Sequence, residues 1–103
     1  MAVTLSDIMA SSQAERLATG FVCTEGPVWH PDGSLLFVDI RRSQILRLVP
    51  GSTPEIIREH SGESNGMTLD MQGRVVICEM GNRQVTRMEA DGPNLAKGDF
   101  LAK

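Results

Sequence analysis

The chain has 103 residues, of which 41% are hydrophobic and 22% are charged, and its formal net charge is −3. This length allows one small domain at most, and the weakly acidic balance offers no basic surface for nucleic acid. The sequence has no apolar run near the roughly 20 residues that span a bilayer, and its start lacks the basic and apolar regions of a secretory signal. We therefore expect a cytoplasmic protein with no nucleic-acid partner and no membrane partner.

The N-terminal segment has two alternative interpretations. Residues 14–20 align with a later strand when the internal repeat described below is extended backwards, which predicts the closing strand of another unit. The rival is a helix from Ser6 to Leu17, because Ser12 and Glu15 have the spacing of a capping box.

Cysteines and aromatic residues give weaker signals. Cys23 and Cys78 fit no metal-binding spacing, so we expect free thiols that are buried in the fold. Aromatic residues make up only 4% of the chain, which makes Phe21, Trp29 and Phe37 the expected packing anchors.

An internal repeat organises most of the chain. Residues 25–51 align without a gap over residues 65–91, so each position meets the one 40 residues later. Turn glycines and apolar runs coincide in the two copies: Gly26 with Gly66, Gly33 with Gly73, and residues 35–38 with residues 75–78. A period of this length indicates one supersecondary unit that is stacked on its neighbours.

Each unit has the signals of an antiparallel meander. Pro31-Asp32-Gly33 and Gln72-Gly73 are turn sequences between apolar runs. The predicted strands are residues 35–40 and 75–80, apolar on both faces, then the alternating segments 44–49 and 84–88, and a fourth strand at 54–59. Four strands in each 40-residue unit are typical of a propeller blade.

Glu25 and Asn65 occupy the same position in successive units, at the start of the innermost strand. Both side chains should point toward the central axis at the same depth. Carboxylate and amide oxygens that converge on a channel suit a hard cation such as calcium, although calcium takes six to eight oxygens. In the alternative interpretation, Glu25 accepts backbone hydrogen bonds at a strand entrance and Asn65 forms a turn before Gly66.

Other polar residues carry little catalytic signal. His30 and His60 precede turns and are expected to be turn residues, while Ser61 and Ser64 lack the context of a serine nucleophile. Asp39 and Glu79 end equivalent strands. They either enrich one face in negative charge or pair with nearby arginines: Arg41, Arg42 and Arg83.

Four short motifs resemble the SMP-30/gluconolactonase/LRE family: TEGPVW at 24–29, FVDI at 37–40, SNG at 64–66 and CEMGNR at 78–83. The resemblance covers about residues 15–92. It implies an all-β fold, a fragment of a six-bladed β-propeller with about two blades plus an N-terminal closing strand. The expected parts of this single partial domain (1–103) are the closing strand at 14–20, the first blade at 25–60 and most of the second at 65–103.

The resemblance also implies a function: hydrolysis of sugar lactones or related esters with a divalent metal, usually calcium. It makes Glu25 a metal ligand and places Asn65 where it contacts the substrate. The other ligands and the general base match no position in this chain, so no catalytic residue lies within it. Met80 stands where the family commonly has histidine, so the role of that histidine is not carried over.

Three hypotheses follow. The leading one is the N-terminal part of a calcium-dependent lactonase-type hydrolase that acts on a small lactone or ester and is inactive as an isolated fragment. The alternative is a non-enzymatic β-propeller scaffold that binds a ligand or a protein. The third is self-association of the short chain through its open propeller edges.

Overall fold

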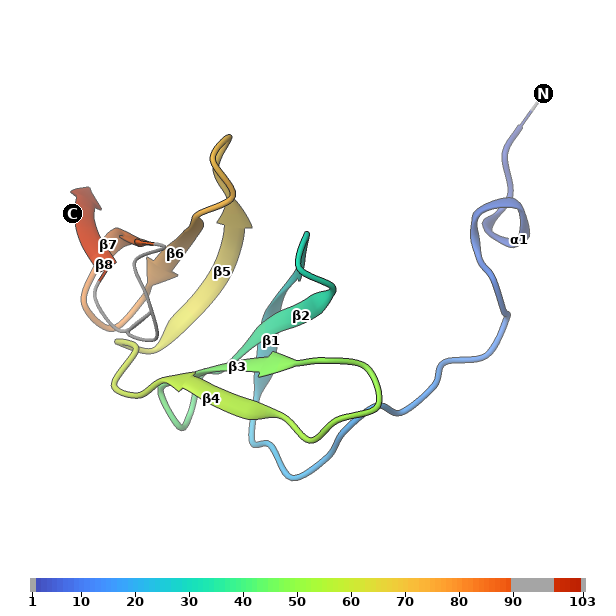
Figure 1. The fold of residues 1–103 in the computed structure, drawn as a ribbon, viewed down its shortest axis with the longest axis horizontal. Coiled ribbons are helices and arrows are strands. Elements are labelled where there is room, and N and C mark those ends of the chain that lie inside the picture. The colour runs from blue at the N-terminus through green and yellow to red at the C-terminus, as the bar shows by residue number, and fades with distance from the viewer. Residues whose placement is uncertain (1, 90–97, 103) are drawn as a thin grey trace.

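Two four-stranded antiparallel sheets lie side by side (Figure 1). A computed structural model describes residues 2–89 with their side chains and residues 98–102 as a backbone. The strands of the first sheet, in order, are β1 (Thr24–His30), β2 (Ser34–Asp39), β3 (Gln44–Leu48) and β4 (Glu55–Arg58). Those of the second are β5 (Ser64–Leu69), β6 (Val75–Glu79), β7 (Gln84–Met88) and β8 (Gly98–Ala102). The predicted all-β class is confirmed.

The two sheets have the same hydrogen-bond register, offset by 40 residues. Thr24 pairs with Asp39 in the first sheet, and Ser64 pairs with Glu79 in the second. Both inner strands carry an irregularity near this pair, between Glu25 and Val28 in β1 and between Ser64 and Met67 in β5. The internal repeat predicted from the sequence is therefore a repeat of backbone geometry.

Equivalent turns close the hairpins. Gly33 and Gly73 both have positive φ, at 87° and 78°, and each donates its N–H to the carbonyl three residues earlier. An aspartate carboxylate supports each turn: Asp32 Oδ1 accepts the Ser34 N–H, and Asp70 Oδ1 accepts the Gln72 N–H. Such side-chain bonds to the local backbone are the reason that aspartate favours turns.

The main core lies between the sheets. β2 and β3 contribute one side of it and β6 and β7 the other: Leu36, Val38 and Ile45 against Val75, Ile77 and Met88. A second cluster lies on the opposite face of the first sheet and comprises Phe37, Leu46 and Leu48, with Phe21 and Leu35 against it. β2 is thus buried on both faces, as its continuous apolar run predicts.

The predictions that the aromatic residues pack in the core and that the cysteines are buried are partly wrong. Phe21 and Phe37 do pack, edge to face, with ring centroids 5.1 Å apart. Trp29, however, is 59% exposed, because its side chain alternates away from the core near the end of β1. Cys23 and Cys78 are free but exposed rather than buried. Cys78 points to the face of β6 that is turned away from the first sheet.

The N-terminal segment contains one helical turn, α1 (Leu5–Ile8), which Thr4 and Asp7 cap. A helix from Ser6 to Leu17 is therefore wrong, and no side chain of α1 is buried to stabilise a longer one. Residues 14–20 lie outside every strand in the described chain, so their role as a closing strand stays a prediction.

Two further findings concern membrane-spanning helices and the bounds of the predicted second blade. Among the described residues, no helix has the length and apolar character needed to cross a membrane. Residues 90–97 and 103 of the predicted second blade lie outside the described residues.

Candidate metal and substrate site

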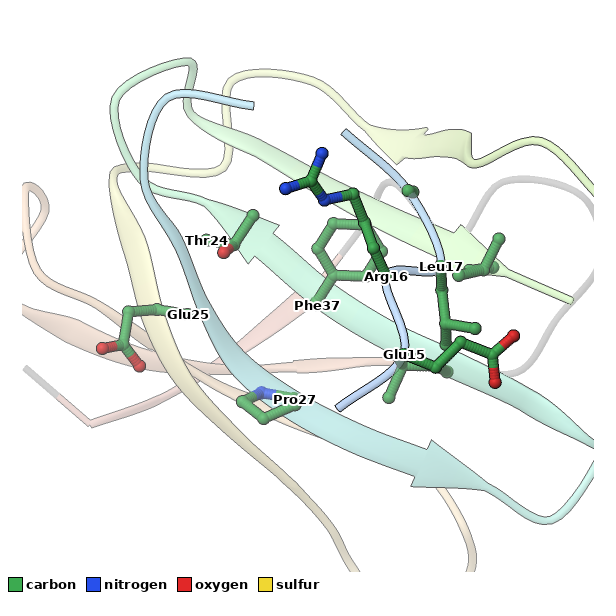
Figure 2. Close-up of a pocket in the computed structure, with 10 residues that line it drawn as sticks. Glu15, Arg16, Leu17, Thr24, Glu25, Pro27 and Phe37 are labelled. Carbon is green, nitrogen blue, oxygen red and sulfur yellow. The ribbon is translucent and has the colours of Figure 1, made fainter. Parts of the chain in front are cut away.

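Glu25 lies near the start of β1, opposite Val38 of β2 and directly before the irregular stretch of the strand. The residue is exposed, and its Oε2 accepts the N–H of the next residue, Gly26, at 3.2 Å. The carboxylate is therefore held by a local bond, and Figure 2 shows it extending away from β1. This orientation leaves it available to a cation.

Gly26 joins Glu25 to the second sheet. It is buried with φ at 56°, and a Cβ built on it would collide with the backbone carbonyl oxygen of Asn65. β1 and β5 can approach this closely only because position 26 has no side chain. The Gly26 backbone therefore lies against the Asn65 backbone, and the two inner strands approach each other at this point.

Asn65 lies second in β5 and is half-buried. It keeps the depth of Glu25 in the neighbouring sheet, since the two inner strands start at equivalent positions. Its amide oxygen has the same donor chemistry as a carboxylate toward a hard cation, without the charge.

A hollow lies on the outer face of the first sheet. It has a volume of about 450 Å³ and lies between residues 15–18 and the apolar side chains of Leu35, Phe37 and Leu48, and Thr24, Glu25 and Pro27 of β1 also line it. Figure 2 shows the Glu25 carboxylate extending away from Phe37 and from Arg16. Glu25 therefore stands at the border of the hollow, with its carboxylate directed away from the apolar floor.

Asp39, at the end of β2, is a structural carboxylate. It is fully buried and accepts the N–H groups of Val22 and Cys23 at 2.9 and 3.2 Å, with Arg42 Nε at 3.9 Å. Burial alone would raise its pKa, but these backbone donors outweigh burial and leave the pKa below its ordinary value. Asp39 therefore anchors the entry to β1.

Glu79 ends β6 and is also buried, at 1% exposed. Its oxygens accept hydrogen bonds from Thr86, Asn82 and Gln84, and Arg58 of the first sheet lies 3.4 Å away. Burial would raise the pKa of Glu79, but these donors and the Arg58 charge hold it below its ordinary value. Asp39 therefore lies beside Arg42, one of the expected arginines, whereas Glu79 pairs with Arg58 and not with the expected Arg83.

Arg58 makes a contact between the two sheets that the sequence did not reveal. It was expected only as part of a strand, yet it links β4 to β6 across the sheets. Its Nη1 is buried without a hydrogen-bond partner in the part of the chain that the structure describes. No local sequence signal marks this contact, because Arg58 and Glu79 belong to different units.

The remaining candidates behave as expected. His30 Nδ1 accepts the N–H of Asp32 within its turn, and Ser64 donates to Ser61 in a buried pair at 2.7 Å. Neither arrangement resembles a catalytic triad.

The donors at the candidate site fit a hard cation in kind but not in number. Glu25 and Asn65 offer one carboxylate and one amide, whereas calcium takes six to eight oxygens. Within residues 2–89 and 98–102, no three His, Cys, Asp or Glu side chains come together as a metal cluster. The described residues therefore do not make up a complete calcium site.

Comparison with known proteins gives a consistent result. The profile of the SMP-30/Gluconolactonase/LRE-like region matches residues 23–90. A gluconolactonase from Xanthomonas campestris, reported as important in glucose secondary metabolic pathways, has 30% sequence identity and a TM-score of 0.68, over 77% of this chain and 26% of that one. A structural-genomics protein assigned as a gluconolactonase by family has 29% identity and a TM-score of 0.74, over 91% of this chain and 31% of that one.

No curated protein matches the chain. The chain spans about a quarter to a third of the length of the two similar structures.

Proposed function

Because the chain belongs to the SMP-30/Gluconolactonase/LRE-like family, we propose that it forms the N-terminal part of a calcium-dependent lactonase-type hydrolase. The activity belongs to the longer protein, and the 103-residue chain alone is inactive. The substrate class is a sugar lactone or a related small ester, as the names of the similar structures suggest.

A six-bladed β-propeller is the architecture that we propose for the longer protein. Its support is the repeated meander: two sheets with the same register, in contact along their inner strands β1 and β5. Successive blades around a channel have this relationship. In this arrangement the starts of the inner strands line the mouth of the channel.

The observation that carries the functional proposal is the junction at Gly26. The missing side chain at this position lets β1 and β5 meet, so an exposed carboxylate and a half-buried amide lie beside the same point. Glu25 would hold the metal through its carboxylate, and Asn65 would orient the substrate or a water molecule with its amide. Calcium, if bound there, would supply the Lewis-acid chemistry that polarises a lactone carbonyl.

The chain itself has a narrower task in this mechanism. Glu25 contributes charge at a fixed depth, because its backbone is paired with Val38. Asn65 is fixed relative to it by the Gly26 contact. The general base and the other metal ligands are assigned to later units, which supply the same inner-strand position.

The test is the Glu25→Gln variant in the longest form of the protein that the gene encodes. We expect calcium affinity to fall by at least about 10- to 100-fold, the loss typical of even an outer-shell partner, and lactone hydrolysis to fall with it. Isothermal titration with calcium and a pH-stat assay with glucono-δ-lactone measure the two effects.

Glu15→Gln is the matched control, because Glu15 is an exposed carboxylate that lies outside the inner strands β1 and β5. Unchanged calcium affinity and rate in Glu25→Gln would refute the assignment and favour a ligand-binding scaffold. The 103-residue chain should show only the uncatalysed rate, and turnover by it would contradict the division of the site among later units.

A further inference from the structure

A second hollow, of about 370 Å³, lies on the face of the molecule where the inner strands begin. It is lined by residues of both units: Cys23, Ile40, Arg41, Glu63 and Met80. Cys23 directly precedes β1, and Glu63 directly precedes β5. Both walls of the hollow therefore belong to units that the structure describes, and its volume falls within the roughly 300–1,000 Å³ typical of ligand pockets.

The walls of this hollow come from equivalent positions of the two units. Cys23 corresponds to Glu63 and Ile40 to Met80 by the offset of 40 residues. The backbone bonds repeat as well. The Cys23 carbonyl accepts the Ile40 N–H at 2.9 Å, and the Glu63 carbonyl accepts the Met80 N–H at 3.2 Å.

Ser43 ties the two walls together. Its carbonyl oxygen accepts the Ser61 N–H and its hydroxyl oxygen accepts the Glu63 N–H, both at 2.9 Å. The loop that contains Arg41 is therefore bonded to the segment that contains Glu63. A hollow whose walls are joined by hydrogen bonds keeps its shape, as largely pre-formed ligand sites do.

Arg41 and Glu63 bring charges of opposite sign to the hollow. Both residues are exposed, and neither forms an ion pair with another of the described residues. Asp39, which was expected to pair with a nearby arginine, lies beside Arg42 instead. The guanidinium of Arg41 therefore remains available to a ligand, and its planar fork of donors matches the two oxygens of a carboxylate.

Gly81, which corresponds to Arg41, makes room for the Glu63 side chain. A Cβ built on Gly81 would lie 3.3 Å from Cδ and 3.4 Å from Cβ of Glu63. The Glu63 carboxyl group therefore lies against the β6–β7 turn of the second unit, while Arg41 comes from the β2–β3 turn of the first. The hollow thus combines a donor from one unit with an acceptor from the other.

We propose that this hollow binds the acidic end of the substrate and that the substrate is a sugar lactone with a carboxylate, an inference that rests on the proposed function. Arg41 donates hydrogen bonds to the carboxylate, and Glu63 accepts hydrogen bonds from sugar hydroxyls. Ile40 and Met80 offer apolar surface to the C–H groups of the sugar.

The hollow adjoins the candidate site along the chain. Cys23 lies two residues before Glu25, and Glu63 lies two residues before Asn65. A substrate whose acidic end lies in the hollow therefore extends its lactone ring toward the carboxylate and the amide that are proposed to act on it.

A carboxylate suits the charges of this face better than a phosphate does. Glu25 and Glu63 both oppose additional negative charge near the hollow, and a phosphate monoester carries about −1.5 to −2 charges at pH 7. A carboxylate carries a single charge, which Arg41 balances. A neutral sugar leaves the charge of Arg41 without a partner.

Two lactones with the same ring test this selectivity in the longest form of the protein that the gene encodes, loaded with calcium. Glucaro-γ-lactone differs from glucono-γ-lactone only in a carboxylate that replaces the terminal hydroxymethyl group. We expect KM to be about 10- to 100-fold lower for glucaro-γ-lactone, the range that one hydrogen bond to a charged group supplies. Equal KM values would overturn the inference and leave the proposed function standing. A still lower KM for a phosphorylated gluconolactone would overturn the carboxylate assignment.

Arg41→Gln should abolish the preference, because it removes the charge and the fork of donors. Arg83→Gln is the matched control, since Arg83 is also exposed, belongs to the equivalent β6–β7 turn and lies outside the hollow. Glu63→Met should raise KM for both lactones, because both present the same ring hydroxyls to the carboxylate of Glu63. A preference that survives in Arg41→Gln would contradict the proposal.

A binding measurement separates this inference from the proposed function. Glucuronate and glucose differ in the same pair of groups, and an NMR titration of the Glu25→Gln variant with each sugar needs no calcium and no turnover. We expect glucuronate to bind more tightly, and the difference to disappear when Arg41→Gln is added. That result, together with an absence of lactonase activity in the unchanged protein, would support the sugar-acid site and refute only the proposed function. Equal binding of the two sugars would refute the sugar-acid site.

Discussion

Gly26 and Gly66 occupy equivalent positions in the inner strands, but only at Gly26 does the structure leave no space for a side chain. Gly26 has positive φ, and a Cβ there would meet the Asn65 carbonyl oxygen, whereas a Cβ on Gly66 would meet nothing within 4 Å. The difference arises because β1 has the second sheet beside it at this point. The repeat alone cannot distinguish the two positions.

We therefore expect Gly26→Ala to lower the free energy of unfolding by about 2 kcal/mol or more, through backbone strain and the contact with Asn65. Gly66→Ala should change it by less than about 0.5 kcal/mol, as is usual for sites free of such features. Urea unfolding of both variants measures the difference. Equal effects in the two variants would show that β1 and β5 do not meet at position 26.

At the scale of elements, one ion pair joins β4 of the first sheet to β6 of the second. The side chains of Arg58 and Glu79 are 11% and 0% exposed, so their interaction is poorly screened by water. Arg47 and Asp32 also form an ion pair, at 3.2 Å, but their side chains are 30% and 42% exposed and both belong to the first sheet.

A double-mutant cycle with Arg58→Met and Glu79→Gln should give a coupling energy of about 1–3 kcal/mol in unfolding. The matched cycle with Arg47→Met and Asp32→Asn should give less than about 1 kcal/mol, as exposed pairs do. A coupling for the buried pair no larger than for the exposed pair would contradict a role in holding the sheets together.

The repeat is also the reason that the strands were predictable. Segments 44–49 and 84–88 were expected, and β3 and β7 span Gln44–Leu48 and Gln84–Met88. Two copies of one pattern reduce the ambiguity of a single short apolar run. The equivalent starts of the inner strands β1 and β5 were predictable for the same reason.

Contacts between units were not predictable in this way. Arg58 of the first unit contacts Glu79 of the second, and the periodicity of the sequence does not encode a contact between positions that are not equivalent. The exposure of Cys78 has a similar origin: its counterpart Val38 is fully buried only because the second sheet covers it. Burial in a stacked array depends on the neighbour as much as on the residue.

At the scale of the whole molecule, buried carboxylates make stability depend on pH. The pKa values of Asp39 and Glu79 lie below their ordinary values of 3.8 and 4.5. Below these ordinary values, the unfolded chain binds more protons than the folded chain does. The stability contributed by the two carboxylates is therefore complete above about pH 5 and is lost as pH falls through the lowered folded values.

We expect the free energy of unfolding to be nearly constant from pH 7 to about pH 5 and to fall steadily below that range. Glu79→Gln should make the fall shallower, because it removes one of the carboxylates whose pKa is lower in the folded chain. Urea titrations across this pH range provide the values. An unaltered slope in Glu79→Gln would contradict the linkage.

The exposure of Trp29 determines which spectroscopic signal can follow the unfolding of this chain. It is the only tryptophan, the chain has no tyrosine, and more than half of the indole already meets solvent in the folded state. Its fluorescence should therefore emit at long wavelength before as well as after unfolding, and quenchers such as iodide should reach it in both states. Circular dichroism of the β-sheets will report the transition, whereas intrinsic fluorescence will be nearly silent.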